Sequence, residues 1–233
     1  MIGIIGAMDI EVARLKDMIE GAENYEKAGM SFVYGKMHGR DVVVVRSGIG
    51  KVNAGICTQI LVDRFNVDYI INTGIAGSLN KDINIGDIVL SSDALQHDMD
   101  ATGFGYEVGV IPQMKESLFK GDEKLINIAK TCLENNIKDI KAFVGRIVSG
   151  DQFISDKAKK EWLVGNFSAY CTEMEGAAVA QAAYLNNVPF VIIRAISDKA
   201  DDSATMDYPV FEALAAEHSV ELISEMVKEI GVE

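Results

Sequence analysis

Cysteine, proline and basic residues are scarce in this sequence, and each scarcity excludes a class of protein. The three cysteines, Cys57, Cys132 and Cys171, are odd in number and far apart, so we expect neither a disulfide framework nor a Cys-x-x-Cys zinc site. Only three prolines, with 48% hydrophobic residues, argue against a collagen-like, disordered or low-complexity chain. The 22 basic residues face 35 acidic ones, a net charge of −13. Nucleic acid and anionic membrane surfaces attract basic patches, so neither partner is expected.

Long apolar runs are missing as well. No stretch approaches the roughly 18 consecutive apolar residues that a membrane-spanning helix needs. The N-terminal segment has no basic region, and Asp9 and Glu11 interrupt its apolar residues, so it does not resemble a signal peptide. We therefore expect a protein of the cytoplasm.

The chain does contain many short apolar runs, which alternate with stretches of helical periodicity. Continuous apolar strands between helices are typical of a largely parallel sheet with both faces covered. No linker or internal repeat is visible, so a single domain over residues 1–233 is predicted. The irregular segment 95–113 indicates a functional loop, because long loops in compact domains usually carry function. The expected strands cover residues 2–5, 31–37, 41–46, 68–72, 87–91, 142–148 and 188–196, and the expected helices 10–19, 52–65, 122–135, 175–185 and 208–230.

Glycine-rich turns follow several of these strands, but none fits a nucleotide-binding motif. The dinucleotide fingerprint G-x-G-x-x-G is absent after any expected strand. Gly50 and Lys51 resemble the end of a P-loop, yet Val45 stands where the first glycine of that loop belongs. The three histidines are too dispersed for a metal site, and the pair His97-Asp98 fits either a structural loop pair or a ligand contact. No metal and no cofactor are expected.

Acidic residues at the ends of expected strands are more informative. Glu11 follows the first strand, Glu175 opens an otherwise apolar helix, and Asp198 ends the last apolar strand, four residues after Arg194. Ligands of parallel α/β sheets bind at the carboxyl ends of the strands. Carboxylates gathered there are costly unless a ligand or a proton compensates their charge. On spacing alone, each of the three also fits a helix cap or a surface charge.

Six motifs in the same order carry a resemblance to a known family. They are GIIGAMDIE at residues 3–11, SGIGKV at 47–52, NTGIAG at 72–77, SGDQFI at 149–154, EME at 173–175 and RAISD at 194–198. The chain resembles the 5′-methylthioadenosine/S-adenosylhomocysteine nucleosidases of the purine nucleoside phosphorylase superfamily over residues 1 to about 230.

The resemblance implies a three-layer α/β/α sandwich around a mixed, mostly parallel and partly barrel-like sheet. It also implies a homodimer without metal or cofactor. The reaction implied is hydrolysis of the N-glycosidic bond of an adenine thionucleoside, which gives adenine plus methylthioribose or S-ribosylhomocysteine.

Catalytic roles follow by position from the same resemblance. Glu11 matches the general base that activates water, and Asp198 matches the acid that protonates purine N7. Ser197 is implied to orient Asp198. Glu175 matches the carboxylate that holds the ribose hydroxyls, and Arg194 is implied to help hold the water.

Contacts with the base and the sugar are implied in the same way. Met174 matches a residue beneath the sugar, and Phe153 matches one that stacks on adenine. The backbone of Ile154 is implied to recognise the Watson–Crick edge of the base. Ala76 and Gly77 match a turn that passes close to the ligand.

The alkylthio group of the substrate is implied to occupy an apolar pocket. Met8, Ile49 and Tyr208 match residues that line it. Phe104 and Pro112 match positions that help to complete it, partly across the dimer interface. That would give the long loop 95–113 its function.

Two departures and two alternatives remain. Ile75 stands where relatives commonly have a small or polar residue, and Tyr208 where Phe also occurs, so a hydroxyl is lost at one position and gained at the other.

A phosphorylase would need a cationic cradle for phosphate, but the first loop carries Asp9 and Glu11 before its first basic residue, Arg14. Water is therefore the favoured nucleophile. A non-catalytic adenosine-binding module is the second alternative, and it has no use for a water-activating base.

Overall fold

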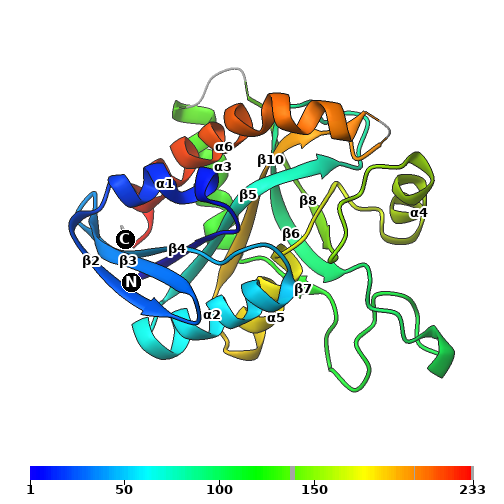
Figure 1. Cartoon of the computed structure of the whole chain (residues 1–233), viewed down its shortest axis with the longest axis horizontal. Helices are drawn as coiled ribbons and strands as arrows, with labels where there is room; N and C mark the ends of the chain where they lie inside the picture. Colours follow the sequence, from blue (N-terminus) through cyan, green and yellow to red (C-terminus); the bar gives the residue numbers. More distant parts are fainter. Residues whose placement is uncertain (137–139, 202, 232–233) are drawn as a thin grey trace.

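A mixed sheet of ten strands forms the middle layer of the molecule (Figure 1). The computed structural model describes residues 1–136, 140–201 and 203–231. The strands of the sheet are β1 (Ile2–Gly6), β2 (Glu20–Lys27), β3 (Met30–Met37), β4 (Arg40–Arg46), β5 (Tyr69–Ser78), β6 (Ile88–Gln96), β7 (Phe119–Lys120), β8 (Ala142–Ser149), β9 (Cys171–Glu173) and β10 (Phe190–Asp198).

Part of the sheet closes on itself. β5 pairs with β10, β10 with β6, β6 with β8, β8 with β9, and β9 again with β5. From this ring the sheet extends through β1 and β4 to the antiparallel β3 and β2. The strands β4, β1, β5 and β10 run parallel to one another, so their carboxyl ends meet at one edge. The partly barrel-like mixed sheet is confirmed.

Helices cover both faces of the sheet (Figure 1). Consecutive residues of a strand point to opposite faces, so Ile4 packs into one apolar cluster and Ile5 into the other. The first cluster includes residues of α1, α3 and α6, and the second includes residues of α2 and α5. The three-layer arrangement is therefore confirmed. The helices are α1 (Asp9–Asp17), α2 (Lys51–Phe65), α3 (Glu123–Asn136), α4 (Lys157–Phe167), α5 (Gly176–Leu185) and α6 (Ala204–Glu229).

Several elements differ from their sequence prediction. The hairpin predicted over residues 31–37 and 41–46 is present as β3 and β4. The strand predicted to end at residue 72 continues to Ser78, and the strand predicted over 87–91 continues to Gln96. The prediction missed β2, β7, β9 and α4. Residues of β2 are almost all exposed, so they show no alternation of apolar and polar side chains.

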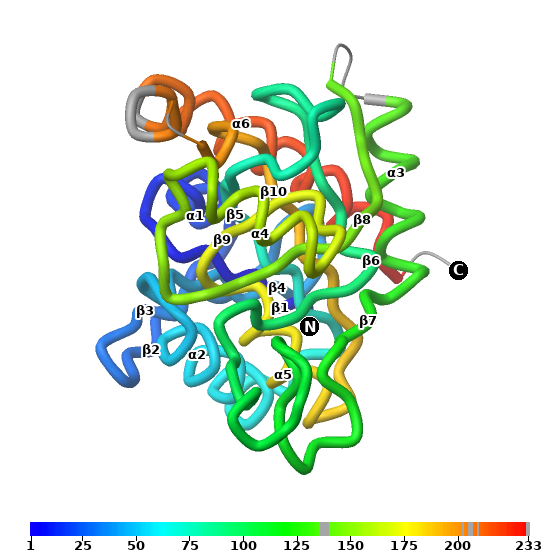
Figure 2. Tube along the Cα trace, turned by 90° about the vertical axis from the view of Figure 1, so that its right-hand side faces the viewer, coloured from blue at the N-terminus to red at the C-terminus, as the bar shows by residue number. Residues whose placement is uncertain are grey.

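The segment between β6 and β7 is irregular, as predicted. Within residues 97–118 it contains one short 3-10 helix, Thr102–Phe104. In Figure 2 this green segment extends beyond α5. No helix in the described parts of the chain is long and apolar enough to cross a membrane. The continuous sheet supports the single domain over residues 1–233, which stays a prediction.

Candidate active site

A cavity of about 430 Å³ lies where the parallel strands end. The residues after β1, the last part of β5, the end of β10 and the segment between β9 and α5 all contribute to its wall. This is the edge at which α/β sheets bind ligands. The lining residues are Ala7, Met8, Glu11, Ile49, Ile75, Ala76, Gly77, Phe153, Thr172, Glu173, Met174, Glu175, Ser197, Asp198 and Tyr208.

Glu11, in the first turn of α1, is held by three backbone N–H groups. Its Oε2 accepts from Ala7 at 2.7 Å and Met8 at 2.9 Å, and its Oε1 accepts from Ile75 at 3.2 Å. Burial raises the pKa of Glu11, whereas the nearby Arg194 and the three N–H groups oppose that rise. The carboxyl group is thus fixed in place, with a pKa above its ordinary value, as a general base near neutral pH requires. The Ile75 contact uses the backbone, so the departure at that side chain leaves it intact.

Asp198, at the end of β10, is buried and has carboxylates for neighbours. Its Oδ2 accepts from Ser197 Oγ at 2.9 Å, and its Oδ1 accepts from the Ala200 N–H at 2.7 Å. Burial raises the pKa of Asp198; the two hydrogen bonds lower it, and the carboxylates of Asp207 and Asp201 raise it further. This environment favours the protonated acid, because burial and the two carboxylates outweigh the two hydrogen bonds.

Glu175 stands at the N-terminus of α5 and lines the same cavity as Asp198. Its Oε1 accepts from the Gly50 N–H at 2.7 Å. Burial, followed by repulsion from Glu173, raises the pKa of Glu175 to about 8; the Gly50 N–H and Arg194 act in the opposite direction. A carboxyl group can accept more hydrogen bonds than the one from Gly50, and hydroxyl groups of a sugar are suitable donors.

Arg194 is not among the residues that line the cavity. A direct contact with the attacking water would need its side chain to reach the cavity wall. Arg194 is 1% exposed, and its Nε and Nη2 donate to Glu173 Oε2. Its Nη1 donates to the Asn72 carbonyl at 3.2 Å, and its Nη2 to Asn72 Oδ1 at 2.6 Å. Burial would raise the pKa of Glu173, but Arg194 and the Ser149 hydroxyl hold it below its ordinary value. Sequence reasoning gave Glu173 no role, although its place in the Glu-Met-Glu motif was a signal.

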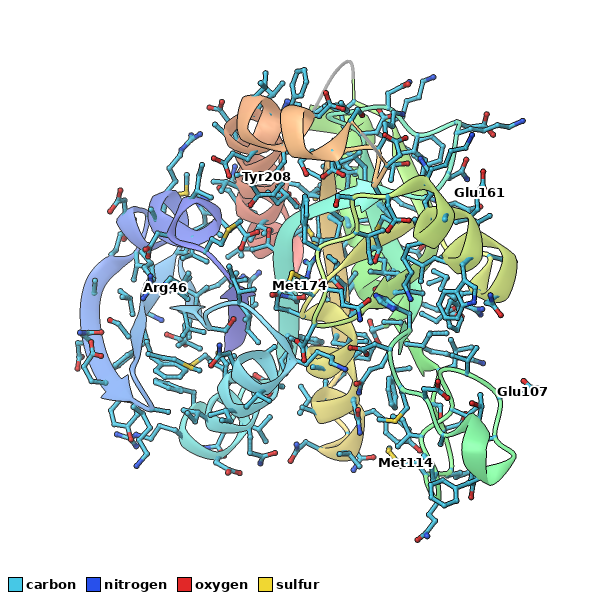
Figure 3. All side chains as sticks on the ribbon, turned by 45° about the vertical axis from the view of Figure 1, so that its right-hand side comes forward. Arg46, Glu107, Met114, Glu161, Met174 and Tyr208 are labelled. Atoms are coloured by element: carbon cyan, nitrogen blue, oxygen red, sulfur yellow. The ribbon has the colours of Figure 1, made fainter. Side chains whose placement is uncertain are left out.

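Apolar side chains cover the outer part of the cavity. The rings of Phe153 and Tyr208 meet edge to face, with centroids 5.7 Å apart. The Tyr208 hydroxyl contacts Met8 Sδ at 3.4 Å, and burial raises the pKa of Tyr208 to about 12. In Figure 3 Met174 lies near the centre of the molecule, and Tyr208 lies above it on α6. Ile154 lies in an adjoining recess of about 30 Å³ that shares Phe153 with the main cavity.

Phe104 and Pro112 do not line the cavity of their own chain. The Phe104 side chain is 87% exposed, on the segment that carries Glu107 and Met114, well away from Tyr208 in Figure 3. Phe104 and Pro112 could reach such a cavity only in a second copy of the chain. Their predicted contribution to the pocket of a partner subunit therefore stays a prediction.

Buried carboxyl groups and apolar side chains thus line one cavity at the strand ends, where proteins of the α/β class bind their ligands. The chain belongs to the phosphorylase superfamily, whose family model matches residues 1–228. Within it, the chain belongs to the family of 5′-methylthioadenosine/S-adenosylhomocysteine nucleosidases, as the following similarities show.

Similarity to known proteins covers nearly the whole chain. A 5′-methylthioadenosine/S-adenosylhomocysteine nucleosidase from Geobacillus sp. strain WCH70 is 44% identical over 98% of this chain and 98% of its own. A crystal structure of such a nucleosidase from Colwellia psychrerythraea, in complex with adenine, is 42% identical, has a TM-score of 0.94 and covers 98% of this chain and 95% of its own. A futalosine hydrolase of Helicobacter pylori is 35% identical, with a TM-score of 0.93 over 98% of this chain and 97% of its own.

Proposed function

We propose that the protein hydrolyses the N-glycosidic bond of 5′-methylthioadenosine and S-adenosylhomocysteine, releasing adenine and methylthioribose or S-ribosylhomocysteine. The observation that carries this proposal is the contrast between two carboxyl groups of one cavity. Asp198 has carboxylate neighbours, whereas Glu11 accepts three N–H bonds beside Arg194. Pairs of titratable groups in contrasting environments are typical of acid and base partners.

Asp198 supplies the proton that adenine needs to depart. The adenine anion is a poor leaving group, and protonation at N7 removes its charge. The raised pKa of Asp198 keeps the carboxyl group protonated closer to neutral pH. Its second oxygen can accept from the exocyclic amine of adenine, whereas a 6-oxopurine places an acceptor there. This arrangement favours adenine as the base.

Glu11, and Glu175 once it is deprotonated, stabilise the cationic sugar that remains. A carboxylate about 4 Å from an oxocarbenium charge contributes about 4 kcal/mol at an effective dielectric constant near 20. That corresponds to roughly a thousandfold in rate. Glu175 accepts the ribose hydroxyls, and Glu11 takes the proton of the attacking water. Arg194 acts through Glu173, which it holds ionised beside the sugar-binding carboxyl group.

Water is favoured over phosphate as the nucleophile because two of the cations near the first loop are already paired with carboxylates. Arg14 forms an ion pair with Glu217, and Arg46 forms one with Asp9. The adjacent Glu11 carboxylate repels a phosphate dianion.

Adenine release in phosphate-free buffer tests this function. We expect full turnover of methylthioadenosine without phosphate and no sugar 1-phosphate when phosphate is added. Turnover that requires phosphate would instead establish a phosphorylase. Binding of adenosine without any turnover would establish the non-catalytic module.

The apolar side chains of the cavity would contact the 5′ substituent of the substrate, and their preference among substituents can be measured. A competition assay with methylthioadenosine, S-adenosylhomocysteine, 5′-deoxyadenosine and futalosine ranks the candidates. The Tyr208 hydroxyl lies against Met8 at this end of the cavity, so we expect Tyr208→Phe to change the ratio between short and long 5′ substituents.

We also propose a homodimer. Val52 and Ile56, four residues apart on one side of α2, are exposed by 72% and 44%, and Ile49, in the turn before the helix, is exposed by 54%. Exposed apolar groups of this kind mark interaction surfaces. Sedimentation or light scattering should give twice the 25.3 kDa of one chain, and a monomer at micromolar concentration would contradict the proposal.

A further inference from the structure

The turn before α2 contacts the sugar-binding carboxyl group through its backbone. The Gly50 N–H donates to Glu175 Oε1 at 2.7 Å, and the next N–H, that of Lys51, donates to Asp151 Oδ1 at 2.8 Å. Gly50 has a φ of 97°, in the region that favours glycine. A Cβ there would lie 3.1 Å from Asp151 Oδ1. The direction of the Gly50 N–H therefore depends on how this turn is held.

The Lys51 side chain holds the same turn from the other end. Its Nζ donates to Asp98 Oδ1 at 2.5 Å and to Gln96 Oε1 at 2.9 Å. Both members of the Lys51–Asp98 ion pair are only 18% exposed. Asp98 Oδ2 in turn accepts from the Asp151 N–H at 2.9 Å. Lys51, Asp98 and Asp151 thus form a closed set of contacts, called here the Lys51 brace.

We propose that the Lys51 brace positions the Gly50 N–H against Glu175 and so holds the sugar-binding carboxyl group in its productive place. This inference rests on the proposed function, and it makes Lys51, Asp98 and Asp151 positioning residues. A purely structural role would tie the start of segment 97–118 to the fold without acting through Glu175. The two roles differ in one measurable respect: only the first makes the effect of Lys51 depend on Glu175.

Lys51→Met removes the cation while keeping much of the side-chain length. We expect kcat/KM for methylthioadenosine to fall about ten- to a hundredfold, the range for loss of a hydrogen bond to a charged group. Lys51→Arg, which keeps a cation, should recover most of that loss. Arg146→Met is the matched control, because Arg146 forms a similarly shielded ion pair with Asp93, at 2.6 Å, away from Glu175. It should lower the thermal midpoint without changing kcat/KM by more than about twofold.

The decisive measurement combines Lys51→Met with Glu175→Ala. If the brace acts through Glu175, Lys51→Met costs less than about twofold in the Glu175→Ala background. Losses that multiply, or a failure of Lys51→Arg to recover activity, overturn the brace while leaving the nucleosidase in place. A folded wild-type protein that releases no adenine overturns the proposed function, and the brace with it.

Discussion

Residue by residue, the cavity places carboxyl groups of the same chemistry in different electrostatic surroundings. Glu173 is compensated by the Arg194 guanidinium. Glu11 is compensated by Arg194 and by three backbone N–H groups. Glu175 and Asp198 have carboxylates for neighbours. Arg194 lowers the pKa values of Glu173, Glu11 and Glu175, whereas nearby carboxylates raise the pKa of Asp198 further.

Glu11→Gln removes the base but keeps an oxygen for the backbone N–H groups. We expect normal binding of adenine and a loss of at least about a hundredfold in kcat, the lower range for general base catalysis. Asp9→Asn is the matched control: Asp9 lies two positions earlier, with a side chain 73% exposed and paired with Arg46. It should leave kcat unchanged. Near-normal turnover by Glu11→Gln in a single-turnover assay would remove Glu11 as the base.

Glu175 also makes a prediction about stability. Its pKa is about 8 in the folded protein against an ordinary 4.5, so between these values the folded state binds more protons than the unfolded state. The free energy of unfolding contributed by this group therefore falls as the pH rises from about 4.5 to 8. Glu175→Gln should raise the thermal midpoint of the ligand-free protein, and by more at pH 8 than at pH 5.

The control for that measurement is Glu161→Gln, on the exposed side of α4, where the side chain is 68% exposed. Its midpoint difference from the wild-type protein should not grow with pH. A gain for Glu175→Gln that shrinks between pH 5 and pH 8 would contradict the raised pKa.

At the scale of the elements, the continuation of β5 past Gly74 builds the site. The strand was predicted to stop at residue 72, because Thr-Gly reads locally as a turn. In the structure Arg194 and Ala195 of β10 pair with Gly74 and Ile75, which continues the ladder. That pairing is non-local, so a sequence pattern cannot reveal it. The missing side chain at Gly74 makes room for a carboxylate from α1.

Gly74→Ala tests that close approach. A Cβ at this position would lie 2.7 Å from Glu11 Oε1, so the carboxylate must move away from the Ile75 N–H. We expect kcat to fall at least about tenfold, the size of one lost hydrogen bond to a charged group. Gly165→Ala, within α4, has no atom within 4 Å of the added carbon. It should stabilise the fold by up to about 1 kcal/mol and leave kcat unchanged, and equal effects of the two variants would contradict the role given to Gly74.

Most of the residues predicted from the sequence line one cavity, because they stand at strand ends in short motifs. Glu11, Glu175 and Asp198 all line one cavity, as their positions suggested. Sequence reasoning failed where a role depends on contacts between distant elements. The charge of Arg194 is taken by Glu173, 21 positions earlier, rather than presented to the cavity. The strand β9, only three residues long, has too few residues to show a periodicity.

Across the whole molecule, some of the acidic residues line the cavity, whereas exposed apolar side chains lie on α2 and on segment 97–118. Of the 35 acidic residues, Glu11, Glu173, Glu175 and Asp198 line the cavity, and the chain keeps a net charge of −13. The exposed apolar side chains include Val52 and Ile56 near the start of α2 and Phe104 on segment 97–118. The Lys51 brace joins these two regions, because Lys51 begins α2 and Asp98 lies at the start of that segment. A partner subunit seated on this surface would be close to the mouth of the cavity.

Mixing two inactive or impaired variants tests whether Phe104 completes the pocket of a partner. Phe104→Ala should raise KM for methylthioadenosine, since it removes apolar contact area worth about 1–3 kcal/mol, and Glu11→Gln should abolish turnover. In a mixed dimer, the subunit with Phe104→Ala keeps its own Glu11 and would receive Phe104 from the Glu11→Gln subunit. After random exchange, about a quarter of all sites are then intact. At low substrate the mixture should exceed the summed activity of the separate variants. If Phe104 served its own chain, or if the protein were a monomer, mixing would give no gain.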